Sequence, residues 1–593
     1  MSATSLLDRS DRLDRAEQPT SAPVVTRRAR VLAAASRLTP IFQQVMTASH
    51  APGLAYGVVL DGELLYTWQA GVRDVATQAP VHAGTVFRIA SMTKSFTALA
   101  ILQLRDAGRL RLDDMAATYA PELATLTYPT VDSPAITVRH LLTMTAGLPQ
   151  DDPWADRQLY RADDWLSELL RNGISWSNPP GLGFEYSNLG YMILGRIIAN
   201  VSGVPMPDYI TRHILQPLGM HDTVWDAADV PPDRLAHGYT WLDDAWHPQE
   251  LLPTGGDVGA FGGLFTTLDD LARWVGLFQT AWSPVDDAPF GQELLSPAAR
   301  REMQQISSVV RPVIAAPEPG QMSDFALGGY GFGLSINQHH GWESVGHSGG
   351  LPGFGSNMRW APAYGVGIIG LTNATYSGVG RVTPRALAYL ITDAKLATQQ
   401  PQPAPSLVAV YDNVNRLLAG WDDALADQLF ADNFFLDLDR AHWQAQLNDL
   451  SHHHGAIQRV GALAAENRLR GAWQVHCARG DFTVWLSLTP TVPPLVQALT
   501  IDSRLPLTEA AQAVVDKLAA LVSHPTRRGL HRLCGRAAER EAVWNRVRMA
   551  HILCGRCRPT DEQASADAAS VHVRLVGDNG AMDVDLQLDD RGK

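Results

Sequence analysis

The alternation of apolar and polar positions predicts an antiparallel sheet that begins early in the chain. Apolar residues at 57–60 and 64–66 flank Asp61-Gly62, a pair that supplies the two positive φ angles of a tight hairpin turn. A second strand pair is expected at 354–360 and 365–371, where two apolar runs enclose a short turn. Both ends of the first domain's sequence are therefore predicted to form β-strands.

Between these strand pairs the apolar period becomes helical. Residues 92–104 place Phe96, Leu99 and Leu104 on one stripe, and Asp106-Ala107-Gly108 supplies a stop, so a buried helix is expected there. A second apolar helix should follow Asn188, and an amphipathic helix should begin near Arg30 and run through Phe42. Strands at both ends with helices between them predict one α+β unit.

Composition shifts divide the 593 residues into several regions. The segment 398–405 is rich in proline, which favours an extended spacer. Residues 477–488 resemble 575–588, which makes the last region a candidate diverged repeat of the α+β region before it. The predicted divisions are a disordered arm at 1–28, a first domain at 29–397, a linker at 398–405, and accessory modules at 406–503 and 504–593.

The charge of the chain limits the kinds of partner it can bind. The net charge of -13 would repel a polyanion, and the arginines between Arg527 and Arg558 have the spacing of a solvated helical face, so nucleic acid is not the expected partner. An RNA- or DNA-binding role for that face is the alternative. Acidic residues and arginines stand where a secretory signal would have its apolar core, and no stretch reaches 18 apolar residues. We therefore expect a cytoplasmic protein without a membrane partner.

The first candidate catalytic motif is Ser91-Met92-Thr93-Lys94. At this spacing, at the start of the buried helix, the Ser91 hydroxyl and the Lys94 amine lie over the same turn. The chain has only four lysines and uses arginine as its usual cation. A desolvated lysine can become neutral and accept the proton of a serine, which arginine cannot do. The alternative is an ordinary N-cap serine followed by a lysine that reaches solvent.

Tyr186 and Asn188 are the second candidate, in an irregular loop that enters the next helix. In an extended stretch these two side chains point the same way. A lysine ammonium would lower the pKa of the tyrosine, which could then relay protons, and the asparagine amide would contact a substrate. The alternative is a turn tyrosine with an N-cap asparagine.

Residues 346–350 are the third candidate. They fit G-x-S-x-G, the pattern of an α/β-hydrolase with Ser348 as nucleophile, but that fold needs a helix directly afterwards and Leu351-Pro352-Gly353 cannot supply one. Small residues instead let a strand approach a ligand, so the N–H groups of Gly350 and Ser91 could bind one oxyanion. Here His347, Ser348 and Gly349 are expected to line the pocket.

Together the three segments resemble the serine hydrolases related to penicillin-binding proteins, class C β-lactamases, D-aminopeptidases and β-lactamase-like esterases, over residues 38–392. The resemblance implies an antiparallel sheet with flanking helices and a helical subdomain, followed here by an α+β accessory region. It implies no metal and no cofactor. It also implies that Ser91 is the acylated nucleophile, that Lys94 and Tyr186 transfer protons, that Asn188 contacts the substrate, and that the Ser91 and Gly350 amides form the oxyanion hole.

His347 departs from the lysine found at this position in β-lactamases, so a fixed positive charge for a substrate carboxylate is absent. This favours a neutral ester or amide, including a D-amino-acid peptide, as the small-molecule substrate. A D-Ala-D-Ala carboxypeptidase or β-lactamase activity, or a catalytically silent sensor on the same fold, is the alternative. The accessory region is a candidate for homo-oligomer contacts.

Other polar clusters give weaker hypotheses. The stretch 149–180 contains aspartates and tryptophans that could wall a pocket and attract a cationic amine, or could simply cap helices and pack. A metal site could draw on His452–His454 or on Cys534 with Cys554 and Cys557, but no H-E-x-x-H is present and one C-x-x-C is weak evidence for zinc.

Overall fold

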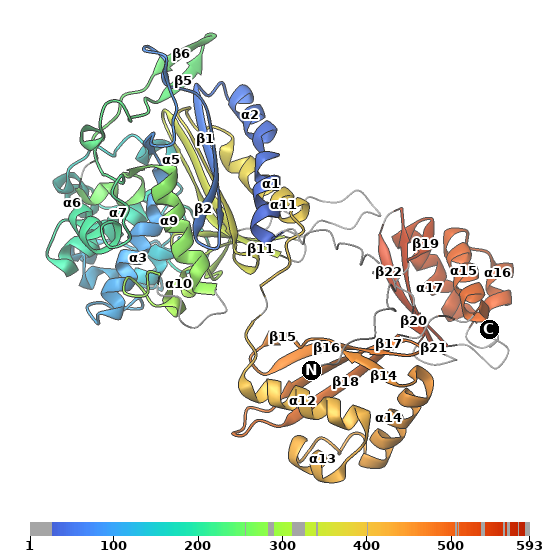
Figure 1. Cartoon of the computed structure of the whole chain (residues 1–593). Helices are drawn as coiled ribbons and strands as arrows, with labels where there is room; N and C mark the ends of the chain where they lie inside the picture. Colours follow the sequence, from blue (N-terminus) through green and yellow to red (C-terminus); the bar gives the residue numbers. More distant parts are fainter. Residues whose placement is uncertain are drawn as a thin grey trace, which may run out of the picture.

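Figure 1 shows the computed structural model, in which an α+β body precedes two smaller α+β regions. The structure describes residues 26–254, 256–282, 290–310, 327–339, 342–399, 401–504, 507, 509–534, 540–560, 564–565, 570–578 and 580–587. Nearly all of the predicted arm, residues 1–25, lies outside them.

The first body is built on a nine-stranded antiparallel sheet in the order β3-β2-β1-β13-β12-β11-β10-β9-β8. Asp61 and Gly62 have φ angles of 50° and 87°, which confirms the predicted hairpin, and the strand pair near the end of the domain is also confirmed. The strands are β1 (Gly53–Leu60), β2 (Glu63–Asp74), β3 (Ala79–Pro80), β8 (Ser308–Val310), β9 (Leu327–Tyr330), β10 (Ser335–His339), β11 (Trp342–Leu351), β12 (Phe354–Ala361) and β13 (Val366–Thr372).

Three helices cover one face of this sheet, namely α1 (Arg27–Ser36), α2 (Thr39–Ala48) and α11 (Val379–Asp393). Their apolar side chains pack on those of β1 and β13. The single helix expected from Arg30 through Phe42 is wrong, because the chain breaks between α1 and α2. Pro40 stands in the first turn of α2, where its missing N–H costs nothing, whereas inside a continuous helix it would remove a hydrogen bond.

The helical subdomain covers the other face. Its central helix is α3 (Thr93–Asp106), which is buried along nearly its whole length and confirms the predicted buried helix. The predicted helix after Asn188 is α7 (Asn188–Ser202). The other helices are α4 (Val138–Leu142), α5 (Asp152–Ala155), α6 (Asp163–Arg171), α8 (Met206–Ile210), α9 (Leu268–Gln279) and α10 (Pro297–Met303). Short 3₁₀ segments include η1 (Ala90–Met92) and η6 (Gly256–Phe261), and the short strand pairs are β4 (Phe87–Arg88) with β7 (Phe265–Thr266) and β5 (Tyr239–Leu242) with β6 (Ala245–Pro248).

Two further α+β regions follow, each with three helices before antiparallel strands. The first has α12 (Pro405–Ala419), α13 (Asp423–Leu429), α14 (Arg440–His454), β14 (Ile457–Val460), β15 (Ala464–Asn467), β16 (Arg470–Cys477), β17 (Asp481–Leu488) and β18 (Val496–Arg504). The second has α15 (Glu509–Ser523), α16 (Arg527–Leu533), α17 (Arg540–Cys554), β19 (Cys557–Pro559), β20 (Ala564–Ser565), β21 (Ser570–Gly577) and β22 (Ala581–Gln587). The two similar sequence segments fall on the hairpins β16–β17 and β21–β22. The repeat and the domain boundaries stay predictions.

Within the described residues, no single helix is long and apolar enough to cross a membrane. One bent pair, α7 with Met206–Leu215 at 74°, has the required length and composition when its two parts are taken together.

Candidate active site

Ser91 lies in η1, at the start of the buried helix α3, with 8% of its surface exposed. The preceding residue, Ala90, has a φ of 51°, a left-handed conformation that costs energy for a residue with a side chain. Surrounding contacts hold this turn, because Ile89 N–H donates to the Leu264 carbonyl and Ser356 Oγ donates to the Ile89 carbonyl. The serine is therefore fixed in a strained turn.

Lys94 is completely buried beneath Ser91 and has three hydrogen-bond partners. Its Nζ lies 3.0 Å from Ser91 Oγ, 2.6 Å from Asn188 Oδ1 and 3.0 Å from the Phe261 carbonyl oxygen. Burial lowers the pKa of Lys94 to about 8, although the charges of Asp152, Asp156 and Asp151 act in the opposite direction. A neutral amine is thus accessible near physiological pH.

Tyr186 lies beside this amine, and its ring centroid is 6.2 Å from that of His347. The Lys94 Nζ is 4.9 Å from the centroid of the Tyr186 ring. The expected lowering of the Tyr186 pKa is wrong: removal of the phenol from water raises it well above its usual value, which outweighs the opposite effect of the hydrogen bond with Ser91. The phenol therefore stays protonated and can donate.

His347 is buried and neutral. Its Nδ1 lies 2.6 Å from the Ser348 carbonyl oxygen, so this nitrogen carries the proton, and its Nε2 accepts from the Tyr330 hydroxyl at 3.1 Å. Burial and then the Lys94 charge lower the His347 pKa to about 3. The position that holds a lysine in β-lactamases is thus without charge here.

The residues of β11 divide between two faces of the sheet. His347 and Gly349 face η1, and a Cβ on Gly349 would lie 2.1 Å from the Ile89 carbonyl oxygen. Ser348 faces away, toward α11, where it accepts from Asn357 Nδ2 at 2.8 Å. Ser348 thus lies on the opposite face of β11 from His347, because successive side chains of a strand point to opposite faces, and its place in the pocket lining stays a prediction.

Gly350 is also on the outer face of β11. A Cβ there would lie 2.6 Å from Tyr376 Cδ1, so the ring of Tyr376 covers this glycine. The Tyr376 hydroxyl donates to Asp156 Oδ2 at 2.5 Å, and burial raises the pKa of that carboxyl to about 7. The ring that packs on Gly350 is thus held in place by Asp156.

Two neighbouring aspartates have different roles. Asp151 caps α7: its Oδ1 accepts from Asn188 N–H at 2.7 Å and its Oδ2 from Leu189 N–H at 2.9 Å. Asp152 Oδ1 instead accepts from Asn188 Nδ2 at 2.8 Å. For Asp151 the helix-capping interpretation is therefore confirmed, whereas Asp152 orients the amide that contacts Lys94.

Three groups that contact the site residues were not predicted from the sequence. The Phe261 carbonyl belongs to backbone, for which no side-chain motif exists. Tyr330 stands within the run Gly328-Gly329-Tyr330-Gly331, and a single large residue among strand glycines was the available signal. Asp152 was noted only as part of an acidic stretch.

Two alternatives fail on the structure. β11 runs through Ser348 and turns at residues 352–353 into β12, so no helix follows the G-x-S-x-G segment and the α/β-hydrolase alternative is wrong. No group of three or more His, Cys, Asp or Glu side chains that could hold a metal ion occurs in the described part of the chain.

A comparison with family models matches residues 38–393 to the model described as Beta-lactamase, which is more than half of the chain. The chain is 29% identical to Penicillin-binding protein 4 of Amycolatopsis lactamdurans, over 56% of this chain and 83% of that protein. It is 33% identical to Protein flp of Staphylococcus aureus strain MW2, over 34% of this chain and 41% of that protein. Among solved structures, the octameric penicillin-binding protein homologue from Pyrococcus abyssi matches with a TM-score of 0.52 and 19% identity, over 94% of this chain and 96% of that chain.

The serine, the lysine beneath it and the antiparallel sheet between two helical layers define the serine β-lactamase-like class of proteins. The chain belongs to the beta-lactamase family.

Proposed function

We propose that the protein is a serine hydrolase that cleaves an ester or amide bond through a covalent acyl-enzyme on Ser91. The observation that carries this proposal is the 3.0 Å contact between Ser91 Oγ and the buried Lys94 Nζ. A lysine with a pKa near 8 can act as the base that serine requires, whereas a lysine in water cannot.

The reaction follows from the groups around Ser91. Neutral Lys94 takes the proton of Ser91 Oγ as the oxygen attacks the carbonyl carbon of the substrate. The amides of Ser91 and Gly350 hold the resulting oxyanion. Tyr186, whose phenol stays protonated, delivers a proton to the leaving group, and Lys94 restores that proton. Water then attacks the acyl carbon by the same route and releases Ser91.

Neutral substrates fit this arrangement best. Class C β-lactamases carry a cation where this chain has His347, and here that side chain is uncharged above a pH of about 3. We therefore propose a neutral ester or amide, including an amide of a D-amino acid, as the substrate class. A D-Ala-D-Ala carboxypeptidase or β-lactamase activity is the second candidate, favoured by the similarity to Penicillin-binding protein 4 of Amycolatopsis lactamdurans.

Intact-mass spectrometry with a fluorophosphonate probe tests the nucleophile. We expect one adduct on the wild type and on Ser348→Ala, and none on Ser91→Ala. A panel of short-chain esters, D-amino-acid amides and nitrocefin then identifies the substrate class. Labelling that depends on Ser348 would overturn the assignment, and neither labelling nor turnover in the wild type would favour a silent sensor on the same fold.

We also propose that the accessory region joins copies of this chain into a homo-oligomer. Support comes from α17, which exposes Met549, Ile552 and Leu553 on one stripe of its surface. The similarity to the octameric homologue from Pyrococcus abyssi extends over this region.

A further inference from the structure

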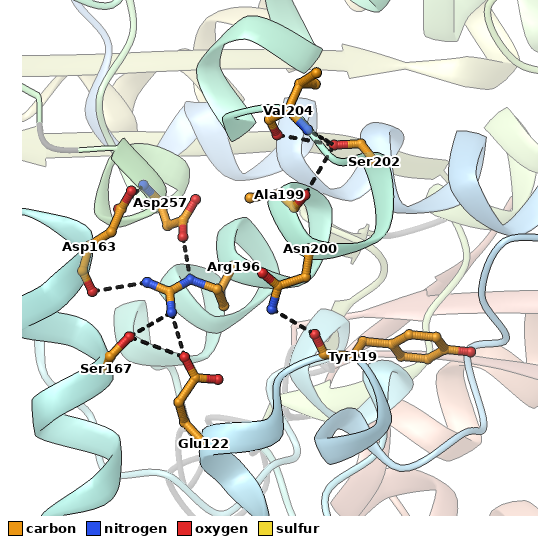
Figure 2. A network of polar contacts seen from close by, with 10 residues as sticks. All are labelled: Tyr119, Glu122, Asp163, Ser167, Arg196, Ala199, Asn200, Ser202, Val204 and Asp257. Carbon is orange, nitrogen blue, oxygen red and sulfur yellow. Dashed lines mark hydrogen bonds and ion pairs between the residues drawn. The ribbon is translucent and has the colours of Figure 1, made fainter.

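A buried arginine ties the 3₁₀ segment η6 to helix α7. Figure 2 shows the Arg196 guanidinium at the centre of this contact. Its Nε donates to Asp257 Oδ2 at 2.5 Å, its Nη1 to Glu122 Oε1 at 2.6 Å and Ser167 Oγ at 2.7 Å, and its Nη2 to the Asp163 carbonyl oxygen at 2.9 Å. All three guanidinium nitrogens are therefore engaged, which fixes Asp257 on the flank of α7.

The backbone of η6 lies directly against the same helix at Gly195. A Cβ at this position would lie 2.4 Å from the Asp257 carbonyl oxygen and 2.8 Å from Ala260 Cβ. From the side of α3, Thr97 Oγ1 donates to the Ala260 carbonyl oxygen at 2.7 Å. The segment is thus fixed at both ends, directly before Phe261.

Phe261 matters because its carbonyl oxygen is one of the three partners of Lys94 Nζ. A neutral amine has two hydrogens and one lone pair. It can take the proton of Ser91 only if the lone pair faces Oγ, so its two hydrogens must go to Asn188 Oδ1 and the Phe261 carbonyl. Asn188 is the first residue of α7, and Phe261 ends the segment that Gly195 and Arg196 hold.

We propose that Gly195 and Arg196 are positioning residues for Lys94. Through η6 they hold the Phe261 carbonyl where it directs the lone pair of the amine at Ser91. Helix α7 then orients both hydrogen-bond acceptors of Lys94. Asn188 belongs to this helix, and Phe261 is held by the contact of Gly195 and Arg196 with η6. The inference rests on the proposed function, in which Lys94 is the base that accepts the Ser91 proton.

The test uses the small number of lysines in the full-length chain. Because there are four, ¹³Cε-lysine labelling gives a spectrum in which Lys94→Arg identifies one signal, and its midpoint can be followed with pH without any turnover. Gly195→Ala displaces η6 sterically, and Arg196→Lys keeps the buried charge but loses the fork that joins Asp257 to Glu122. Displacement of the Phe261 carbonyl removes a hydrogen-bond acceptor of the Lys94 ammonium. Both variants should therefore lower the pH midpoint of the Lys94 titration.

Gly190→Ala is the matched control, on the same helix, because a Cβ there would have its nearest neighbour at 3.7 Å. It should leave the midpoint unchanged. With an active substrate, Gly195→Ala and Arg196→Lys should lower kcat at least tenfold, leave KM within twofold, and move the acid limb of the kcat profile to lower pH.

An unchanged midpoint of the Lys94 titration in both variants would overturn the inference. A raised midpoint would also overturn it, because water entering the site would by itself raise the pKa of Lys94. Failure of the proposed function has a different signature. In that case the wild type would lack the fluorophosphonate adduct on Ser91, whatever the lysine titration shows.

Discussion

Lys94 illustrates how burial changes the chemistry of one side chain. Its neighbours include three aspartates whose charges favour the ammonium, yet desolvation is the larger effect and lowers the pKa to about 8. The aspartates keep this value from falling further. The Lys94 amine therefore titrates close to physiological pH, as the proposed role of a base requires.

The pH dependence of turnover should report this balance. Only the neutral amine accepts a proton, so kcat/KM should rise with pH through a midpoint near 8. Asp152→Asn removes the charge that raises the Lys94 pKa most, and should move the midpoint to lower pH. The exposed Asp132→Asn serves as control and should not move it. A profile that falls between pH 7 and 9 would contradict Lys94 as the base.

The burial of His347 should affect the stability of the protein at low pH. Its pKa is near 3 in the folded chain against an ordinary value of 6.5, so between these values the unfolded chain binds a proton that the folded chain does not. The free energy of unfolding should therefore decrease as pH falls from 6.5 toward 3. His347→Gln should weaken this dependence, and His247→Gln, at an exposed position on β6, should not. Thermal unfolding recorded across this range measures it, and equal slopes for both variants would contradict the burial of a neutral His347.

At the level of elements, the meeting of β11 with η1 decides whether the site is assembled. Glycine at position 349 lets the strand approach the turn that carries Ser91, because any Cβ would meet the Ile89 carbonyl oxygen and Ser356 Oγ. The sequence signal was a run of small residues. It indicated a close approach but not the partner, which comes from a segment more than 250 residues earlier in the chain.

Gly349→Ala should separate β11 from η1. We expect loss of at least about 2 kcal/mol of stability, from overpacking, and a larger loss of fluorophosphonate labelling than of folded protein. Gly378→Ala is the control, since no atom lies within 4 Å of its added Cβ. Circular dichroism and labelling rates measure the two effects, and full labelling of Gly349→Ala would show that this contact does not position Ser91.

Other elements were predictable because their signals are local. The hairpin at Asp61-Gly62 and helix α3 depend on turn residues and on apolar periods within a few residues. The break between α1 and α2 was missed because the apolar period continues across it, although Pro40 gave a local signal of a helix start.

At the scale of the whole molecule, the chain extends well beyond the family domain at 38–393. The proposed oligomer gives this extension a role. Met549→Glu with Ile552→Glu should shift the full-length protein toward a smaller species, because charges on this stripe would be desolvated in an interface.

Light scattering after gel filtration measures the oligomer. Val131→Glu, which alters an exposed apolar residue in the first domain, should leave the mass unchanged. A monomeric wild type, or an unaffected mass in the double variant, would contradict the proposal.

The sequence by itself determined two strand pairs and two buried helices of the first domain, and three motifs that the structure brings into neighbouring positions. It did so because turn chemistry, apolar period and residue type are local properties. Tertiary structure alone decided which face of β11 each residue occupies, which backbone carbonyl meets Lys94, and how far burial shifts the pKa values of Lys94, Tyr186 and His347. These depend on segments far apart in the chain, whose distance and exclusion of water exist only after they pack.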